Sequence, residues 1–240
     1  MVIILQDTKR ERLPERHELK YFINRGDMIA LGHRLGGVLH PDPHADEKGE
    51  YFIRSLYFDD AYDMAFYDKV SGNQNRDKYR IRIYNLSDEA IFLERKRKLG
   101  DLIQKSSTRI SRKLCDQLVM GSCNKLDLVD NALLNDLFRE MRVSLLRPKV
   151  IVDYTRETFI HPVENVRVTL DKNLRTGLLS RNLFSPDVMT VSPLDDGREI
   201  LEVKYDSYLP DFISAMLWDV PAERSAISKY VLCRRFEPLG

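Results

Sequence analysis

Alternating polar and apolar positions dominate the chain, and the alternation is clearest between residues 78 and 84. One set of alternate positions (one parity) carries three cations and a tyrosine, namely Lys78, Arg80, Arg82 and Tyr84. The other parity is apolar and consists of Tyr79, Ile81 and Ile83. Successive side chains of a β-strand point to opposite faces. The stretch therefore predicts a strand with one cationic face and one apolar face.

The same alternation predicts seven more strands, at 16–23, 51–59, 91–98, 102–112, 149–160, 166–174 and 198–206. Two of these strands follow directly along the chain and repeat the cationic face: one carries Lys96 and Lys98, and the other carries Lys105 and Arg109. Neighbouring strands with cations on one face repel one another unless an anion lies between them. We therefore expect a polyanion with the spacing of phosphates.

Between the strands, the spacing of apolar residues and the capping signals predict helices at 26–38, 60–70, 113–120, 126–146, 210–220 and 223–235. Asn24 is the expected N-cap of the first helix. The Ser-, Pro- and Asp-rich segment 180–197 is typical of a loop. No internal repeat or linker divides the sequence, so we predict a single domain over residues 1–240.

Two arrangements of eight such strands fit the alternation. One is an open antiparallel sheet with its charged face in water. The other is an α+β fold built on an eight-stranded antiparallel β-barrel, with the apolar faces turned out toward packed helices and the cations turned into a tunnel. An eight-stranded barrel is just wide enough inside for side chains or one narrow ligand. We favour the barrel because the polar faces are enriched in Arg and Lys.

The charge composition of the chain limits the classes of ligand that we expect it to bind. The 240 residues include 38 Lys and Arg against 37 Asp and Glu, so the net charge is only +1. A polyanion site must therefore come from local concentration of charge, and a general nucleic-acid binder is not expected. Positions for base stacking among the cations are few, and a narrow barrel would exclude bases.

The cysteines and the lengths of the apolar runs are used to predict the cellular compartment of the protein. Cys115, Cys123 and Cys233 are an odd number without metal-ligand spacing, which favours free thiols in a reducing compartment. No run of about 18 apolar residues is present, and the apolar start at residues 1–5 is too short for a signal peptide. We expect a soluble cytoplasmic protein without a membrane segment, and the sequence does not fix its oligomeric state.

Eight short motifs follow one another in a recognisable order. They are RHELKY at 16–21, SLYFD at 55–59, KYRIR at 78–82, LERK at 93–96, DYTR at 153–156, VRVTLD at 166–171, LEVKY at 201–205 and SKY at 228–230. The set resembles the vacuolar transporter chaperone (VTC) domain, a branch of the CYTH-like triphosphate tunnel metalloenzymes, and it covers nearly the whole chain. The resemblance implies an eight-stranded tunnel lined by basic residues, with a C-terminal helix that closes it.

The resemblance also implies an activity. Well-understood VTC-like domains are polyphosphate polymerases, which transfer the γ-phosphate of ATP to a growing polyphosphate chain and use a divalent metal, Mn²⁺ or Mg²⁺. ATP and polyphosphate are therefore the expected partners, without nucleic acid. Phosphoryl transfer depends mainly on positioning and on neutralising the phosphate oxygens. Arg offers a planar fork for these oxygens, and Lys offers a point charge.

Carried over position by position, the resemblance implies catalytic cations at Lys20, Arg80, Arg82, Lys96, Arg156 and Arg167. It implies substrate-binding residues at Lys105, Tyr154, Lys204, Ser228 and Lys229. It implies a metal ligand at Glu202, and carboxylate chemistry makes Glu18 a helper. Glu18 and Glu94 have an alternative role, which is to neutralise adjacent cations such as Lys20.

Three activities compete on this fold. Related hydrolases carry Glu-x-Glu-x-Lys on the first strand, where this chain has Arg16 in place of the first glutamate. The substitution favours the polymerase over a tripolyphosphate or nucleoside triphosphate hydrolase. A polyphosphate-binding module without catalysis is the third alternative.

The alternation of the strands also predicts where other cations and several aromatic residues lie. Arg95 and Arg97 have the opposite parity to Lys96, so we expect them on the outside, paired with helix carboxylates. The aromatic side chains of the 60–70 helix are expected in the core, and they are Tyr62, Phe66 and Tyr67. Four further cations are expected in the tunnel or at its rim, namely Arg54, Lys78, Lys98 and Arg109.

Overall fold

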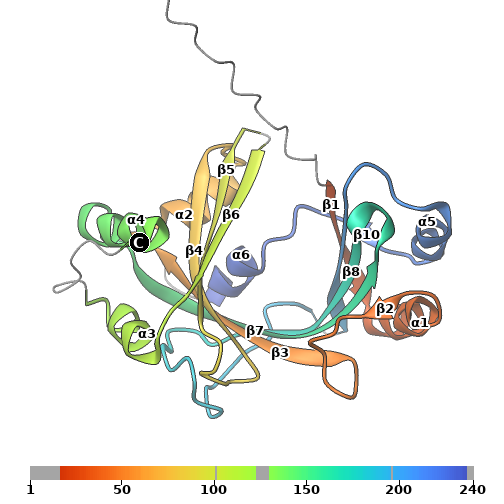
Figure 1. Cartoon of the computed structure of the whole chain (residues 1–240), viewed down its shortest axis with the longest axis horizontal. Coiled ribbons are helices and arrows are strands. Elements are labelled where there is room, and N and C mark those ends of the chain that lie inside the picture. The colour runs from red at the N-terminus through yellow and green to blue at the C-terminus, as the bar shows by residue number, and fades with distance from the viewer. Residues whose placement is uncertain (1–16, 101, 123–129, 196, 237–240) are drawn as a thin grey trace, which may run out of the picture.

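The computed structural model describes residues 17–100, 102–122, 130–195 and 197–236. Its strands are β1 (His17–Asn24), β2 (His40–Pro41), β3 (Glu50–Asp59), β4 (Arg76–Tyr84), β5 (Phe92–Leu99), β6 (Leu102–Arg109), β7 (Arg147–His161), β8 (Val166–Thr176), β9 (Arg198–Tyr205) and β10 (Glu223–Arg224). They form one antiparallel sheet in the order β10-β1-β9-β8-β7-β3-β4-β5-β6, with β2 paired to β7. The sheet curls into a U (Figure 1).

The eight predicted strands correspond to the eight long strands of the sheet, and the α+β class is confirmed. The closed eight-stranded barrel is not confirmed, because the sheet has ten strands and no ladder within the described ranges joins β6 to β1. One extra strand, β10, comes from residues predicted as the start of a helix; it pairs with β1 at Tyr21 and Phe22. The edge of β1 that a barrel would present to β6 is thus partly occupied.

The helices are α1 (Arg25–Gly36), α2 (Met64–Val70), α3 (Arg112–Val119), α4 (Ala132–Val143), α5 (Asp211–Trp218) and α6 (Lys229–Cys233), with 3-10 turns η1 (Val163–Asn165) and η2 (Arg234–Phe236). As predicted, Asn24 caps α1, and its Oδ1 accepts a hydrogen bond from the amide of Asp27 at 2.9 Å. The beginning of the predicted 126–146 helix lies outside the described residues. No helix in the described ranges is long and apolar enough to span a bilayer.

Apolar packing on the convex face holds the helices against the sheet. On one arm, Ile81 and Leu93 pack with Leu137 and Met141 of α4. On the other arm, α1 and α5 cover β8 and β9, and Figure 1 shows both helix groups outside the U. Each fully buried aliphatic side chain contributes about 1.5–3 kcal/mol, so the apolar parity is held outward. The opposite parity faces the concave side.

The structure corrects three predictions and confirms a fourth. Tyr62 lies in the turn before α2 and is 75% exposed, and Tyr67 is 43% exposed on α2, a short helix that buries none of its residues. The core prediction was wrong for both. Arg54 lies on the convex face in a buried bidentate pair with Asp153, at 2.9 and 2.8 Å, so it was wrongly counted among the tunnel cations. Arg95 lies outside and pairs with Asp136 of α4 at 2.5 Å, as predicted. Arg97 was predicted to pair with a helix carboxylate as well, but it pairs with Asp77 of the neighbouring strand β4 at 2.6 Å, so that partner was wrong.

Candidate functional site

Alternate strand residues line the concave face, and α6 lies against that face (Figure 1). The contacts of α6 identify the inward parity: Lys229 pairs with Asp171 of β8 at 2.5 Å, and Tyr230 stacks on Tyr57 of β3 with ring centroids 5.3 Å apart. The strand registers extend this assignment across the sheet. Every strand residue predicted for the site has the inward parity, namely Glu18, Lys20, Arg80, Arg82, Lys96, Lys105, Tyr154, Arg156, Arg167, Glu202 and Lys204. We call this set, with Ser228 and Lys229 of α6, the channel site.

The first arm of the channel site is organised by Glu94. Its Oε2 accepts from Nε of Arg80 at 2.7 Å, and its Oε1 lies 2.6 Å from Nζ of Lys105. Arg82 is 3.9 Å from the same carboxylate. Burial alone would raise the pKa of Glu94, but Arg80 and Arg82 outweigh it and hold the pKa at about 2. Glu94 on β5 is therefore an anion that fixes cations from the two strands beside it, β4 and β6.

Two tyrosines orient the arginines of this arm. Nη1 of Arg80 donates to the hydroxyl of Tyr57 at 2.7 Å, and Nη2 of Arg82 donates to the hydroxyl of Tyr154 at 3.1 Å. Tyr57 was missed as a site residue by the sequence reasoning. Its parity in the 55–59 motif indicates the inward face, but a tyrosine at an alternating position is equally typical of a core.

The second arm holds two carboxylates that share a lysine. Nζ of Lys20 lies 3.1 Å from Glu18 and 3.3 Å from Glu202, while Lys204 forms an ion pair with the other oxygen of Glu202. Burial opposes ionisation of Glu202, but Lys20 and Lys204 outweigh it, so its pKa lies well below the usual range. Both carboxylates are thus charged and face the channel.

One ion pair connects the two arms of the U. Nζ of Lys96 on β5 lies 3.0 Å from Oε2 of Glu18 on β1, although these strands are at opposite sides of the sheet order. This ion pair therefore bridges the two arms at a place where no backbone ladder joins them within the described ranges.

The floor of the channel site is built from β7, β8 and α6. Nε of Arg156 donates to Asp171 at 2.6 Å, and Lys229 holds the second oxygen of the same carboxylate. Both cations lie over the ring of Tyr154, at 5.2 and 5.0 Å from its centroid. Asp171 is fully buried; burial raises its pKa, but Arg156 and Lys229 outweigh this and lower it. Cation–π contacts of this kind position the charged groups.

Two predicted residues are placed less centrally. Arg167 has the inward parity and lies opposite Lys204 in the ladder, but its guanidinium is 39% exposed and pairs with Asp42 in the loop after β2. Ser228 acts as the N-cap of α6, and its Oγ also accepts from Nζ of Lys78 at 3.2 Å. The structure thus places Arg167 at the rim and Ser228 beside Lys78.

Lys78 differs from its neighbours in the channel. Its ammonium group lies near Ser228 and 5.3 Å from the ring centroid of Tyr230, and no carboxylate of the described chain forms an ion pair with it. Burial, together with the nearby cations Lys69 and Arg76, lowers the pKa of Lys78 to about 7. The surroundings of Lys78 in the folded chain therefore disfavour its charged form.

Cations outnumber carboxylates on the described part of the concave face. The cations are Lys20, Lys78, Arg80, Arg82, Lys96, Lys105, Arg156, Lys204 and Lys229, and the carboxylates are Glu18, Glu94, Asp171 and Glu202. Because the pKa of Lys78 is about 7, this side chain is only partly charged at neutral pH. Without Lys78, and without Arg167 at the rim, eight cations on strands of both arms and on α6 still face four carboxylates. Such a concentration of one sign between low-dielectric walls attracts a polyanion.

The residues also fit a divalent cation of the Mg²⁺ or Mn²⁺ type. Such ions take oxygen ligands and often need only one or two carboxylates, with phosphates and water completing the shell. Glu18 and Glu202 supply two charged carboxylates that converge on Lys20. The described residues contain no group of three or more His, Cys, Asp or Glu side chains that could hold a metal by themselves.

Comparisons with solved structures and curated proteins gave the following results. A solved structure of HpAC1 from Hippeastrum, an adenylyl cyclase candidate described as having a dominant triphosphatase activity, aligns with a TM-score of 0.57 at 17% identity, over 92% of this chain and 96% of that one. A second solved structure, an adenylate cyclase candidate from Bacillus halodurans, aligns with a TM-score of 0.49 at 11% identity over 87% of each chain. At these identities the first likeness concerns the fold alone. No curated protein matches the chain in sequence.

The family comparison is more specific. The model of the VTC domain matches residues 15–236, which is nearly the whole chain and includes all eight motifs. The chain therefore belongs to the VTC domain family.

Proposed function

We propose that this protein is an ATP-dependent polyphosphate polymerase. The observation that carries the proposal is the convergence of eight cations from both arms of the sheet and α6 on one concave face, in a chain of the VTC domain family. A chain of phosphates carries about one negative charge per unit, so it can contact successive cations along the channel. ATP presents the same chemistry through its triphosphate.

In the proposed reaction, a terminal oxygen of the polyphosphate attacks the γ-phosphorus of ATP. The new P–O bond lengthens the polymer by one phosphate, the bond from the γ-phosphorus to the β-bridging oxygen breaks, and ADP leaves with that electron pair. Arg80 and Arg82 are assigned to the transferring phosphoryl group because Tyr57 and Tyr154 orient their guanidinium planes. Charge neutralisation of the equatorial oxygens is the main catalytic contribution. No protein nucleophile is required.

The remaining residues are assigned by position. Lys20, Lys96 and Arg156, with Arg167 at the rim, are proposed to bind phosphates along the path. Substrate contacts are assigned to Lys105, Tyr154, Lys204, Ser228 and Lys229. The phosphates of a bound ligand would compete with the protein's carboxylates for these cations. Each ion pair that a phosphate replaces would free one carboxylate. Glu202 and Glu18, once freed, would hold the divalent metal. That ion would supply further neutralisation of the phosphate oxygens.

ATP supply and a reducing environment are both cytoplasmic, so we propose the cytoplasm as the compartment. Of the two described cysteines, Cys115 and Cys233, neither forms a disulfide.

The direct test is incubation with ATP and Mn²⁺, with the product sized on a polyacrylamide gel. We expect long-chain polyphosphate from the wild type. Arg80→Ala/Arg82→Ala should lower the rate at least 100-fold, since loss of one electrostatic donor typically costs about 100- to 1000-fold. Arg97→Ala/Arg112→Ala is the matched control, because both arginines lie outside the channel and pair with carboxylates that are partly or fully accessible to solvent. This variant should retain wild-type activity.

Lys105→Ala gives an independent check, because this side chain is more than half exposed and its loss should be tolerated by the fold. Its polymer yield should fall about tenfold. Release of orthophosphate from tripolyphosphate without polymer would instead identify a hydrolase. Tight binding of tripolyphosphate without any turnover would identify a binding module, and either result would refute the polymerase.

A further inference from the structure

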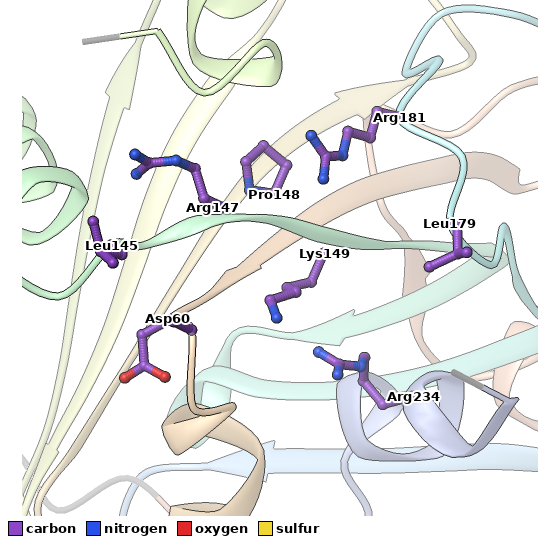
Figure 2. A pocket seen from close by; sticks show the side chains of 9 residues that line it. Asp60, Leu145, Arg147, Pro148, Lys149, Leu179, Arg181 and Arg234 are labelled. Atoms are coloured by element: carbon purple, nitrogen blue, oxygen red, sulfur yellow. The ribbon is translucent and has the colours of Figure 1, made fainter. Parts of the chain in front are cut away.

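A cleft of about 610 Å³ lies at the beginning of β7, apart from the channel site. Figure 2 shows the side chains around it: Arg147 and Lys149 from β7, Arg181 from the loop that follows β8, and Arg234 from η2, with Asp60 at one side. None of these residues belongs to the channel site. Four cations from three separate segments therefore surround a second cavity.

The carboxylates near the cleft neutralise only part of this positive charge. Oδ1 of Asp60 is engaged by the backbone, where it accepts from the amides of Tyr62 and Met64 at 2.9 and 3.0 Å. Asp63 lies buried beneath the cleft, and one of its oxygens holds both Lys149 and Arg234, at 3.1 and 2.9 Å. With both carboxylates counted, four positive charges face two negative ones. The cleft has a net positive charge.

Two guanidinium groups have capacity for a ligand. The side chain of Arg181 is exposed, and it makes no hydrogen bond or ion pair with the described part of the chain. Arg147 is held by Nη1 alone among the described residues, which donates to the carbonyls of Met141 and Leu146 at 2.7 and 2.8 Å. A guanidinium has five N–H donors. Most donors of these two arginines are therefore not used within the described structure.

We infer that this cleft is a second anion-binding site, which takes a linear oligophosphate such as tripolyphosphate. The volume is larger than one orthophosphate ion needs and lies in the range of ligand pockets. Four cations around one space suit several linked phosphates, which Arg binds bidentately. None of the described residues that line the cleft is aromatic, so these residues offer no stacking surface of the kind with which proteins commonly hold a base.

The cleft and the channel site lie at opposite ends of α6. Ser228 and Lys229 at its start face the channel site, whereas Arg234 directly after its end faces the cleft. Tyr230 lies between them and contacts Asp59 and Nη1 of Arg234 through its hydroxyl. The second site is therefore a separate site, and its existence does not depend on polymerisation in the channel.

The test is isothermal titration of the full chain with tripolyphosphate at low ionic strength. The Arg80→Ala/Arg82→Ala variant weakens the channel, so the remaining binding should report the cleft. Adding Arg181→Glu to this background should weaken that binding at least tenfold. Arg224→Glu is the matched control, since Arg224 is an exposed arginine on β10 whose partner Tyr21 has outward parity; the same change of charge there should alter binding less than twofold.

Three results would overturn the inference. They are the absence of residual binding in the channel variant, equal effects of Arg181→Glu and Arg224→Glu, and binding of ADP as tight as that of tripolyphosphate. If the channel variant does not fold, NMR of the wild-type protein replaces it: tripolyphosphate should shift the amides of residues 145–149 and 178–182 in addition to those of the channel strands. Shifts confined to the channel strands would refute a second site. Polymer yield is not read in these experiments, so their failure is distinguishable from failure of the polymerase assignment.

Discussion

Replacement of Lys78 by methionine tests whether the channel holds an uncompensated cation. Burial, with Lys69 and Arg76 nearby, lowers the pKa of Lys78 from an ordinary 10.5 to about 7. The folded protein therefore binds fewer protons than the unfolded chain between these two pH values. The cost of keeping this lysine is fully present below pH 7, and it disappears as the pH rises toward 10.5.

The size of the effect follows from the two pKa values. At about 1.36 kcal/mol per pKa unit, the difference corresponds to about 5 kcal/mol at pH 6 and about 2 kcal/mol at pH 9. A methionine side chain is about as long as that of lysine, but it cannot make the hydrogen bond to Ser228. Loss of this bond costs about 1 kcal/mol. We expect Lys78→Met to raise the free energy of unfolding by about 4 kcal/mol at pH 6 and by about 1 kcal/mol at pH 9.

Urea unfolding at pH 6 and pH 9, followed by circular dichroism, measures both values. Lys113→Met, at an exposed lysine of α3, should change stability little and equally at both pH values. Tripolyphosphate should stabilise the wild type more than Lys78→Met, because the bound anion compensates the ammonium charge. A variant that is less stable than the wild type at pH 6, or a gain that does not shrink by pH 9, would refute the reasoning.

Three further substitutions separate structural roles from ligand binding. Glu94→Gln should lower the free energy of unfolding by about 3 kcal/mol at pH 7, because the cations around Glu94 outweigh its burial and hold its pKa at about 2. In urea titrations, the difference in stability between variant and wild type should shrink as the pH falls from 5 to 2. A difference that stays constant over this range would contradict the prediction. Arg54→Ala should cost about 3–5 kcal/mol by leaving Asp153 buried without its partner, yet polymer yield per folded molecule should equal that of the wild type. Arg156→Ala removes one of two cations on Asp171 and should weaken tripolyphosphate at least tenfold by calorimetry; unchanged affinity would exclude it from the channel.

Much of the site was predictable because strand alternation is a local property. The parity of Arg80 and Arg82 follows from two residues per repeat along an extended backbone, and the structure places both on the concave face. The prediction that Arg95 points outward follows from the same repeat and is confirmed. The error at Arg54 has a related cause: its parity matches the apolar face, but a cation on that face suggested a channel position, and its buried partner Asp153 is 99 residues away.

Other features depend on segments that are remote in sequence. Glu18 and Lys96 are 78 residues apart, and their ion pair connects the two arms of the sheet. Arg167 meets Asp42 only because the loop after β2 passes beside β8. The role of Tyr57 requires knowing which guanidinium reaches its hydroxyl. No pattern in the neighbouring residues specifies such partners.

The amino-acid sequence by itself determined which residues share a face, because the pleated backbone repeats every two residues whatever surrounds it. Only the tertiary structure decided that the cationic face is the concave one, that a side-chain ion pair rather than a backbone ladder bridges the two arms of the sheet, and that a second basic cleft lies beyond α6. These outcomes depend on strand twist accumulated over the whole sheet and on the packing of helices against its convex face. The twist of the sheet and the packing of the helices depend on contacts throughout the chain, so they cannot be predicted from any single stretch of sequence.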